Sequence, residues 1–262
     1  MTDFTTHSIL RDAYSRLRDQ GVEDPTVERV VHGENMVYLE YPGLDGSRRP
    51  GVAHSPGGAF PPIDGRPASE VVDLALADEP TPATRALAVA TLNALSRGHI
   101  DWQSGDPMEG LDVDIDRIAM VGMFKPAFKK FEDVDIRVIE RFPEDVCPPA
   151  DLPRGVTVDM YGPEGAETAF AETAVVYITG STFVYGGIGD YLSVVPPRAT
   201  VVVIGSTSSF LPAPLFEAGA DVVAGATVDD PVRVRAGVTA GASVPHLHRN
   251  GLEKGLVRAA EE

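Results

Sequence analysis

Cysteine and long apolar segments are scarce in this sequence, and each scarcity excludes a class of protein. The chain has a single cysteine, Cys147, in 262 residues, which excludes an internal disulfide and a cysteine-based zinc cluster within one chain. No apolar stretch reaches about 18 residues, the length of a membrane-spanning helix. The N-terminus, Met1 to Ser8, lacks the basic and apolar regions of a signal peptide. We therefore expect a cytoplasmic protein.

Positive charge is also scarce. The chain has 22 basic residues against 39 carboxylates, a net charge of -17, and only four of the basic residues are lysines: Lys125, Lys129, Lys130 and Lys254. An acidic, lysine-poor surface stays hydrated when salt screens charge, so we expect a halophilic protein. Such a surface repels phosphate groups, and neither nucleic acid nor an anionic membrane is an expected partner.

The apolar fraction of 43% is sufficient for packed cores, and we expect two domains. The segment from His99 to Asp116 is polar and acidic, which places the boundary between domains at 1–110 and 111–262. In the first domain, Ser8 is the expected N-cap of a helix that ends before Gly21. The other elements expected there are a hairpin of residues 27–31 and 36–41, a strand at 51–54, and helices at 68–77 and 84–97.

The second domain alternates between strand-like and helix-like segments. Runs typical of strands occur at 117–121, 135–140, 156–160, 174–178, 200–204 and 222–224. Helical segments are expected at 126–131, 163–172, 212–216, 232–238 and 252–260. This alternation predicts an α/β fold with a mostly parallel, Rossmann-like sheet, preceded by the smaller α+β domain.

Three of these strands end in glycine-containing turns, at the edge where open α/β sheets bind ligands. The turns are Gly122-Met123-Phe124, Thr179-Gly180-Ser181-Thr182 and Gly205-Ser206-Thr207. Glycine permits a sharp turn, and the backbone N–H groups and hydroxyls suit an anionic ligand. The alternative is that Ser181 or Thr182 only caps the following helix.

Two further polar residues are candidates for the same site. Glu140 ends a strand at the ligand edge and is suited to act as an acid, a base or a ligand contact; the alternative is a salt bridge to Arg141 or Arg85. Asn93 interrupts an otherwise apolar helix, and a buried amide needs hydrogen-bond partners. Its role is therefore either a structural contact or a ligand contact from the first domain.

The motifs of common cofactor sites are absent. No G-x-G-x-x-G follows an expected strand, so NAD is not an expected cofactor, and neither a phosphate-binding G-K-[ST] loop nor a G-x-S-x-G nucleophile turn occurs. For a metal ion, the candidates are His246 and His248, which share one face if the segment is extended. The alternative is that this pair is simply exposed to solvent.

Short motifs occur along most of the chain, at residues 90–95, 121–124, 138–141, 178–183, 204–205, 211–212, 215–216, 219–225 and 228–231. In this order they resemble the heavy-metal chelation family. The resemblance implies an enolase N-terminal-like domain followed by a Rossmann-like domain. Two departures fall at the implied site: Tyr185 stands where the family commonly has Asn, and Gly205-Ser206-Thr207 replaces a Gly-Pro-Ser turn.

The resemblance implies that a heavy-metal species or a related small ligand binds in the cleft between the domains. Together with the turns, it predicts a protein that binds such a metal species or an anionic small molecule. The alternative is an enzyme of small-molecule or cofactor metabolism, a transferase or lyase, that uses the same hydroxyl-lined pocket. A third interpretation is that the chain is a subunit of an assembly, such as a homo-oligomer, and that its cleft is vestigial.

Overall fold

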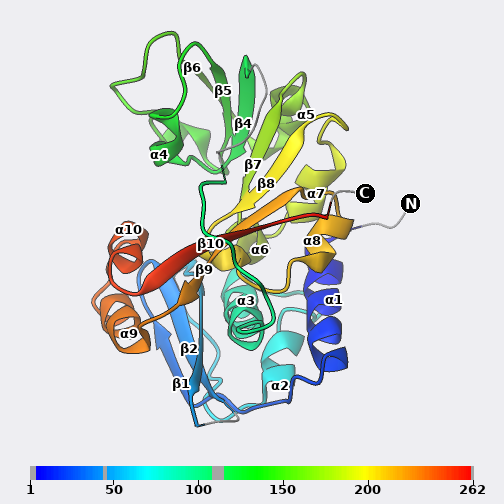
Figure 1. Cartoon of the computed structure of the whole chain (residues 1–262), viewed down its shortest axis with the longest axis vertical. Helices are drawn as coiled ribbons and strands as arrows, with labels where there is room; N and C mark the ends of the chain where they lie inside the picture. Colours follow the sequence, from blue (N-terminus) through cyan, green and yellow to red (C-terminus); the bar gives the residue numbers. More distant parts are fainter. Residues whose placement is uncertain (1–3, 44–45, 108–114, 261–262) are drawn as a thin grey trace.

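The protein contains two β-sheets connected and covered by helices (Figure 1). The structure is a computed structural model that describes residues 4–43, 46–107 and 115–260. One sheet is antiparallel with the order β1-β2-β3, and the other has seven strands in the order β10-β9-β8-β7-β4-β5-β6. The predicted α/β class with a mostly parallel sheet is confirmed. The predicted boundary between residues 110 and 111 lies outside the described residues and stays a prediction.

The first sheet contains the predicted hairpin and third strand, β1 (Arg29–His32), β2 (Met36–Pro42) and β3 (Arg48–His54). Its helices are α1 (Thr6–Asp19), α2 (Ala68–Asp73) and α3 (Pro82–Leu95). Ser8 was the expected cap of α1, but the N-cap is Thr5. Its hydroxyl accepts a hydrogen bond from the Ser8 N–H, and the Ser8 hydroxyl accepts one from the Thr5 N–H. Both residues belong to one capping box, which places the helix start earlier.

The second sheet contains the six predicted strands, the last of them longer than predicted, and a seventh that was not predicted as a strand. They are β4 (Arg117–Val121), β5 (Asp135–Ile139), β6 (Thr157–Tyr161), β7 (Val175–Thr179), β8 (Thr200–Ile204), β9 (Val222–Val228) and β10 (Leu252–Arg258). The helices are α4 (Lys125–Phe128), α5 (Ala166–Phe170), α6 (Thr182–Tyr185), α7 (Ile188–Ser193), α8 (Ala213–Glu217), α9 (Pro231–Thr239) and α10 (Val244–His248). Short 3-10 turns occupy Pro143–Asp145, Pro163–Gly165 and Ser206–Ser208.

The strand order determines where this sheet can hold a ligand. From β4 the chain adds β5 and β6 on one side, and it then returns to the other side of β4 to add β7, β8 and β9. This is the strand order of doubly wound dinucleotide-binding sheets, in which a crevice opens where the order reverses. That switch point lies between β4 and β7, next to the turns at Gly122 and Thr179.

The helix predicted at 252–260 is wrong, because this segment is strand β10. It pairs antiparallel with β9 from Leu252 opposite Val228 to Arg258 opposite Val222. The spacing of Leu252 and Leu256 fits a helix, but both side chains are buried because of sheet pairing. The side chain of Trp102 covers this strand pair, since a Cβ added at Gly255 or Gly225 would lie within 2.7 Å of one of its atoms.

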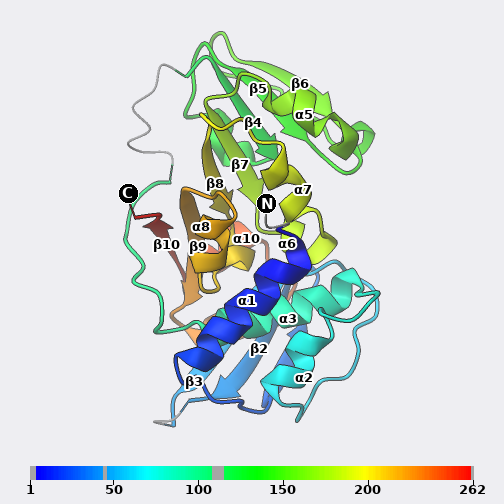
Figure 2. The ribbon, with the colours of Figure 1, turned by 90° about the vertical axis from the view of Figure 1, so that its right-hand side faces the viewer.

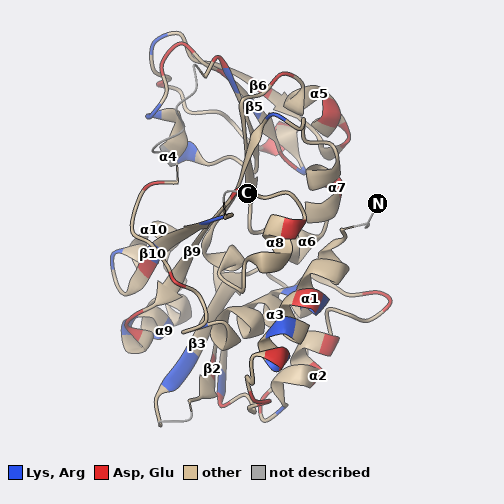
Figure 3. Ribbon diagram, turned by 45° about the vertical axis from the view of Figure 1, so that its right-hand side comes forward, with Lys and Arg blue, Asp and Glu red and all other residues tan. Residues whose placement is uncertain are grey.

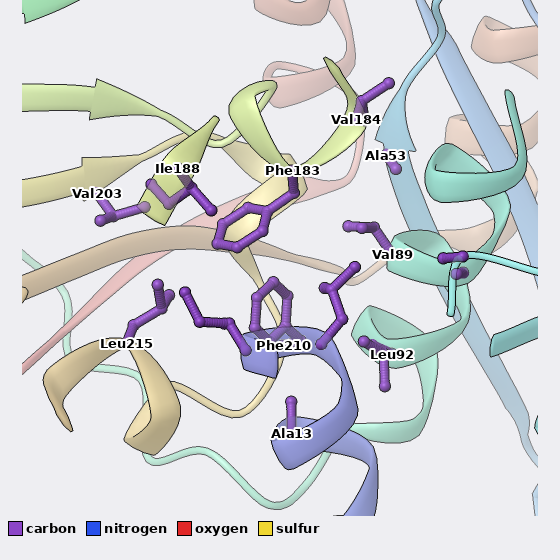
Figure 4. Packing of buried hydrophobic residues seen from close by; sticks show 14 of the residues in the cluster. Ala13, Ala53, Val89, Leu92, Phe183, Val184, Ile188, Val203, Phe210 and Leu215 are labelled. Carbon is purple, nitrogen blue, oxygen red and sulfur yellow. The ribbon is translucent and has the colours of Figure 1, made fainter. Parts of the chain in front are cut away.

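A continuous apolar core joins the two sheets. Helix α3 lies between the three-stranded sheet of β1, β2 and β3, called the hairpin sheet below, and the loops of the seven-stranded sheet, called the large sheet. Helix α1 runs across α3 towards α8 (Figure 2). In this core, Phe183 of α6 packs edge-on against Phe210 with ring centroids 5.0 Å apart, surrounded by side chains from α1, α3 and α8 (Figure 4). The loop that follows β7 is therefore anchored in the core that holds both sheets together.

Acidic residues occur on several helices that cover the sheets, whereas Glu40 of β2 is buried. Asp and Glu occur on α1, α2, α5 and α8 (Figure 3). No helix in the described ranges is long and apolar enough to cross a bilayer.

Candidate functional site

A cavity of about 990 Å³ opens at the carboxyl edge of the large sheet. The turns after β4, β7 and β8 form one side, and the loop after β5 with α6 and α7 forms another. The hairpin sheet contributes Met36 and His54, and α10 contributes Val244. The cavity therefore lies between the two sheets, at the switch point between β4 and β7.

Most of the residues expected at the site line this cavity. They are Gly122, Met123, Phe124, Glu140, Thr179, Ser181, Thr182, Gly205, Ser206 and Thr207. The turns approach one another closely because of glycine: Gly122 has φ of +83°, and a Cβ there would lie 2.9 Å from Cγ2 of Thr179. A larger residue at position 122 would push the β4 and β7 turns apart.

Gly180 and Asn93 do not line the cavity. A Cβ on Gly180 would point at the backbone nitrogen of Ser208, 2.8 Å away, so this glycine is required by packing of the neighbouring turn. The Asn93 amide donates to the carbonyl oxygens of Val52 at 2.7 Å and of Ser206 and Thr207, both at 3.2 Å. Asn93 therefore ties the hairpin sheet to the turn after β8, which is the structural role weighed against ligand contact.

The hydroxyls of the β7 turn are organised around Thr179. Ser181 donates its hydroxyl to Oγ1 of Thr179 at 3.2 Å, and Thr182 donates to the carbonyl oxygen of Thr179 at 2.7 Å. No side-chain cap is present at the start of α6. The hydroxyls of Ser181 and Thr182 therefore do not cap helix α6. Thr179 and Ser181 line the cavity, and their hydroxyl oxygens can accept further hydrogen bonds.

Glu140 is held in place by the neighbouring turn. Its Oε1 accepts a hydrogen bond from the backbone N–H of Met123 at 2.6 Å. Among the ion pairs of the described residues, none joins Glu140 to Arg141 or Arg85. Glu140 therefore makes a charge-assisted hydrogen bond to the β4 turn and not the salt bridge considered as its alternative role.

A contact between the two sheets that the sequence did not reveal involves His54, Tyr185 and Arg141. Nε2 of His54 lies 3.0 Å from the hydroxyl of Tyr185, and Cζ of Arg141 lies 3.5 Å from the centroid of the Tyr185 ring. The backbone N–H of His54 donates to Oγ1 of Thr207 at 2.9 Å. In the sequence, only the departure from the family pattern at Tyr185 pointed to this contact. Its partners could not be predicted, because the three residues come from separate segments of the chain.

Tyr177 was also missed, because it lies within an apolar strand run. Its side chain is 1% exposed and lines the cavity, and its hydroxyl has no hydrogen-bond partner among the described residues. Burial raises the pKa of this phenol, which therefore stays protonated. A buried hydroxyl without a partner costs stability, so a group from a ligand is the expected partner.

Acidification below about pH 6.5 is expected to weaken folding through His54. Burial, and then the charge of Arg141, lowers its pKa from 6.5. The unfolded state then binds a proton at a higher pH than the folded state, so His54 adds no pH dependence above 6.5 and lowers stability as pH falls towards its folded pKa. Urea unfolding of wild type and His54→Gln between pH 7.5 and 5 checks this. The variant should show a shallower loss, by up to about 1.4 kcal/mol per pH unit, and equal slopes would contradict the prediction.

The family comparisons agree with this architecture. Two family models, both described as "Putative heavy-metal chelation", match residues 14–96 and 107–256. The chain belongs to this family. No match was found among curated proteins.

Two solved structures show the same fold. A protein of unknown function from Pyrococcus horikoshii is 21% identical, with a TM-score of 0.77 over 96% of this chain and 100% of its own. A protein of unknown function from Desulfitobacterium hafniense is 18% identical, with a TM-score of 0.72 over 96% of this chain and 98% of its own. At these identities the likeness concerns the fold alone.

The histidines proposed for a metal ion do not fit one. The interpretation of an extended segment is wrong, since both lie in helix α10, where a spacing of two residues points side chains in different directions. Nδ1 of His248 lies 2.8 Å from the carbonyl oxygen of Leu252, and Nε2 lies 3.4 Å from Oγ of Ser206, whereas His246 is exposed. Within the described part of the chain, no group of three or more His, Cys, Asp or Glu is placed to hold a metal ion.

Proposed function

We propose that this heavy-metal chelation family member binds a small organic molecule in the cleft between its two sheets. The observation that carries the proposal is a cavity of about 990 Å³ lined in part by Tyr177, whose buried hydroxyl has no partner among the described residues. Native proteins rarely leave such a group unpaired, and pockets that hold small ligands are few and largely preformed. A heavy metal fits this site as part of an organic complex better than as a bare ion.

The charges around the cleft favour an uncharged or cationic ligand over the anion expected from the turns. The carboxylates of Glu140, Glu164, Glu167 and Asp190 line it, and Arg141 is the one Lys or Arg among the described lining residues. Clefts lined by one sign of charge concentrate ligands of the opposite sign. The hydroxyls of Thr179 and Ser181 suit the polar groups of such a ligand.

Removal of the Tyr177 hydroxyl should separate ligand binding from folding. In Tyr177→Phe the unpaired buried group is gone, so the free protein should be as stable as wild type or up to about 1 kcal/mol more stable. Retention of the co-purifying organic molecule should fall at least about tenfold, since a buried hydrogen bond is lost. Urea unfolding of ligand-free protein and native mass spectrometry of protein as purified check the two effects.

Tyr41→Phe is the matched control. Tyr41 is equally buried, but its hydroxyl is paired with Oγ1 of Thr91 at 2.9 Å, away from the cleft. This variant should lose about 1 kcal/mol of stability and keep its ligand. If Tyr177→Phe also lost stability and kept its ligand, the hydroxyl would have no role in binding.

An enzyme is the second candidate, favoured by the pairing of His54 with Tyr185. A hydrogen-bonded imidazole and phenol that both face a cavity are suited to move a proton to or from a bound molecule. Tyr185→Phe keeps the ring beside Arg141 and removes the proton-transfer group. Native mass spectrometry of the two purified proteins distinguishes the candidates. If the protein is an enzyme, wild type should carry bound product and the variant bound substrate. If it only binds its ligand, both should carry a molecule of the same mass.

A further inference from the structure

The position of Glu140 in the sheet carries information about the kind of ligand. It follows β5, the strand next to β4, and stands 18 positions after Gly122 in the numbering. In sheets of this strand order, an acidic residue about 20 positions after the first turn glycine accepts a hydrogen bond from a ribose hydroxyl. The sheet thus places a carboxylate where a nucleoside's sugar lies in dinucleotide-binding proteins.

The local contacts orient this carboxylate towards the cavity. The N–H of Gly122 donates to the carbonyl oxygen of Ile139 at 2.8 Å, which places Glu140 beside the β4 turn. The bond from Met123 N–H then fixes Oε1. No other hydrogen bond of the described residues reaches the carboxylate of Glu140, so Oε2 and a lone pair of Oε1 are available to two adjacent hydroxyls.

Apolar side chains lie beside the carboxylate. Met123, Phe124 and Ile139 line the cavity, and the first two pack in the same apolar cluster as Tyr177. A flat heterocycle gains from contact with apolar and aromatic surface, and its ring nitrogens or exocyclic groups can pair with a buried phenol. The cleft thus offers an acceptor for a diol and an apolar surface with one polar group for a base.

The elements that bind phosphate in dinucleotide sites are not present beside Glu140. The β4 turn reads Gly122-Met123-Phe124-Lys125-Pro126 instead of G-x-G-x-x-G. The rim carboxylates Glu164 and Glu167 and the nearby Asp190 would repel a pyrophosphate. The ligand is therefore expected to lack phosphate groups.

We infer that the cleft binds a ribonucleoside or nucleoside derivative without phosphate, with Glu140 accepting hydrogen bonds from its vicinal diol. This inference rests on the proposed function and specifies its ligand. It assigns Glu140 a role in selecting ribose, apart from its contact with the Met123 backbone.

Isothermal titration with four ribonucleosides, their 2′,3′-dideoxy counterparts and NAD tests the inference. At least one ribonucleoside should bind ligand-depleted wild type at about 1 mM or below. It should bind at least about tenfold more tightly than its dideoxy counterpart, because two hydrogen bonds to a charged acceptor are lost. NAD should bind more weakly than the nucleoside.

Glu140→Gln and Glu167→Gln are the matched variants. Both remove one carboxylate from the cleft lining, but only the first changes the diol acceptor, and its remaining amide oxygen can still accept from Met123. Glu140→Gln should weaken ribonucleoside binding about tenfold and leave dideoxynucleoside binding unchanged. Glu167→Gln should leave the ratio between the two unchanged.

Equal affinity of ribo and dideoxy forms, no detectable binding of any nucleoside, or equal effects of the two variants would overturn the inference. If nucleosides fail while another organic molecule is found in the cleft, the inference about ribose falls and the proposed function stands. If no organic molecule occupies the cleft, both fall.

Discussion

Gly51→Ala is expected to lose about 3 kcal/mol or more of folding stability. Gly51 lies in β3 where the strand backbone contacts α3, and an added Cβ would lie 2.0 Å from the carbonyl oxygen of Ala90 and 2.7 Å from the backbone nitrogen of Ala94. Backbone atoms of a buried helix cannot move aside locally, so β3 and α3 would have to separate. Urea unfolding followed by circular dichroism measures the loss.

Gly57→Ala controls for the substitution itself. Gly57 has φ of +74° and no atom within 4 Å of an added Cβ, so only the backbone conformation is strained. A loss of about 1 kcal/mol is expected there. Similar losses at the two positions would show that the close packing of β3 on α3 does not limit the fold.

Phe183→Ala should have the second large effect, a loss of about 3 to 5 kcal/mol. Phe183 is fully buried, and its ring packs edge-on against Phe210 between elements of both halves of the chain (Figure 4). The cavity left behind would also loosen the turn of Thr179 to Thr182, which directly precedes Phe183. Ligand retention should therefore fall together with stability.

Phe142→Ala is the comparison for this variant. Phe142 is 55% exposed, and its removal should change stability by less than about 0.5 kcal/mol. Denaturation midpoints of the two variants, measured side by side, check the difference. A loss at Phe183 as small as that at Phe142 would contradict the packing described for α6.

Local patterns were sufficient to predict most of the fold. The segments that form β4, β7 and β8 are apolar, contain β-branched residues and are followed closely by glycine. Their predicted ends therefore agree with the observed ends to within one residue. The segment at 252–260 failed because a strand at a sheet edge and an amphipathic helix share the same apolar spacing. Only its antiparallel pairing with β9 decides between them, and that pairing depends on distant residues.

The site was predictable where it depends on topology. The turns after β4, β7 and β8 had to meet at one edge once the sheet was doubly wound, and they do. The contact of His54 with Tyr185 was not predictable, since it depends on how the hairpin sheet docks on the large sheet. Gly180 was expected at the ligand site, but its missing Cβ makes room for Ser208 of the next turn. We therefore expect Gly180→Val to disturb folding before it affects a ligand.

Native mass spectrometry of wild type and Ser181→Trp, both purified without chelators, tests the central claim most directly. Ser181 lines the cleft and is partly exposed, so the indole should fill ligand space without entering the core. The account predicts an organic molecule of a few hundred daltons bound to wild type, on the scale of a ligand that fills such a pocket, and its loss from a folded Ser181→Trp. Wild type without any bound molecule, or the same bound mass in both proteins, would contradict it.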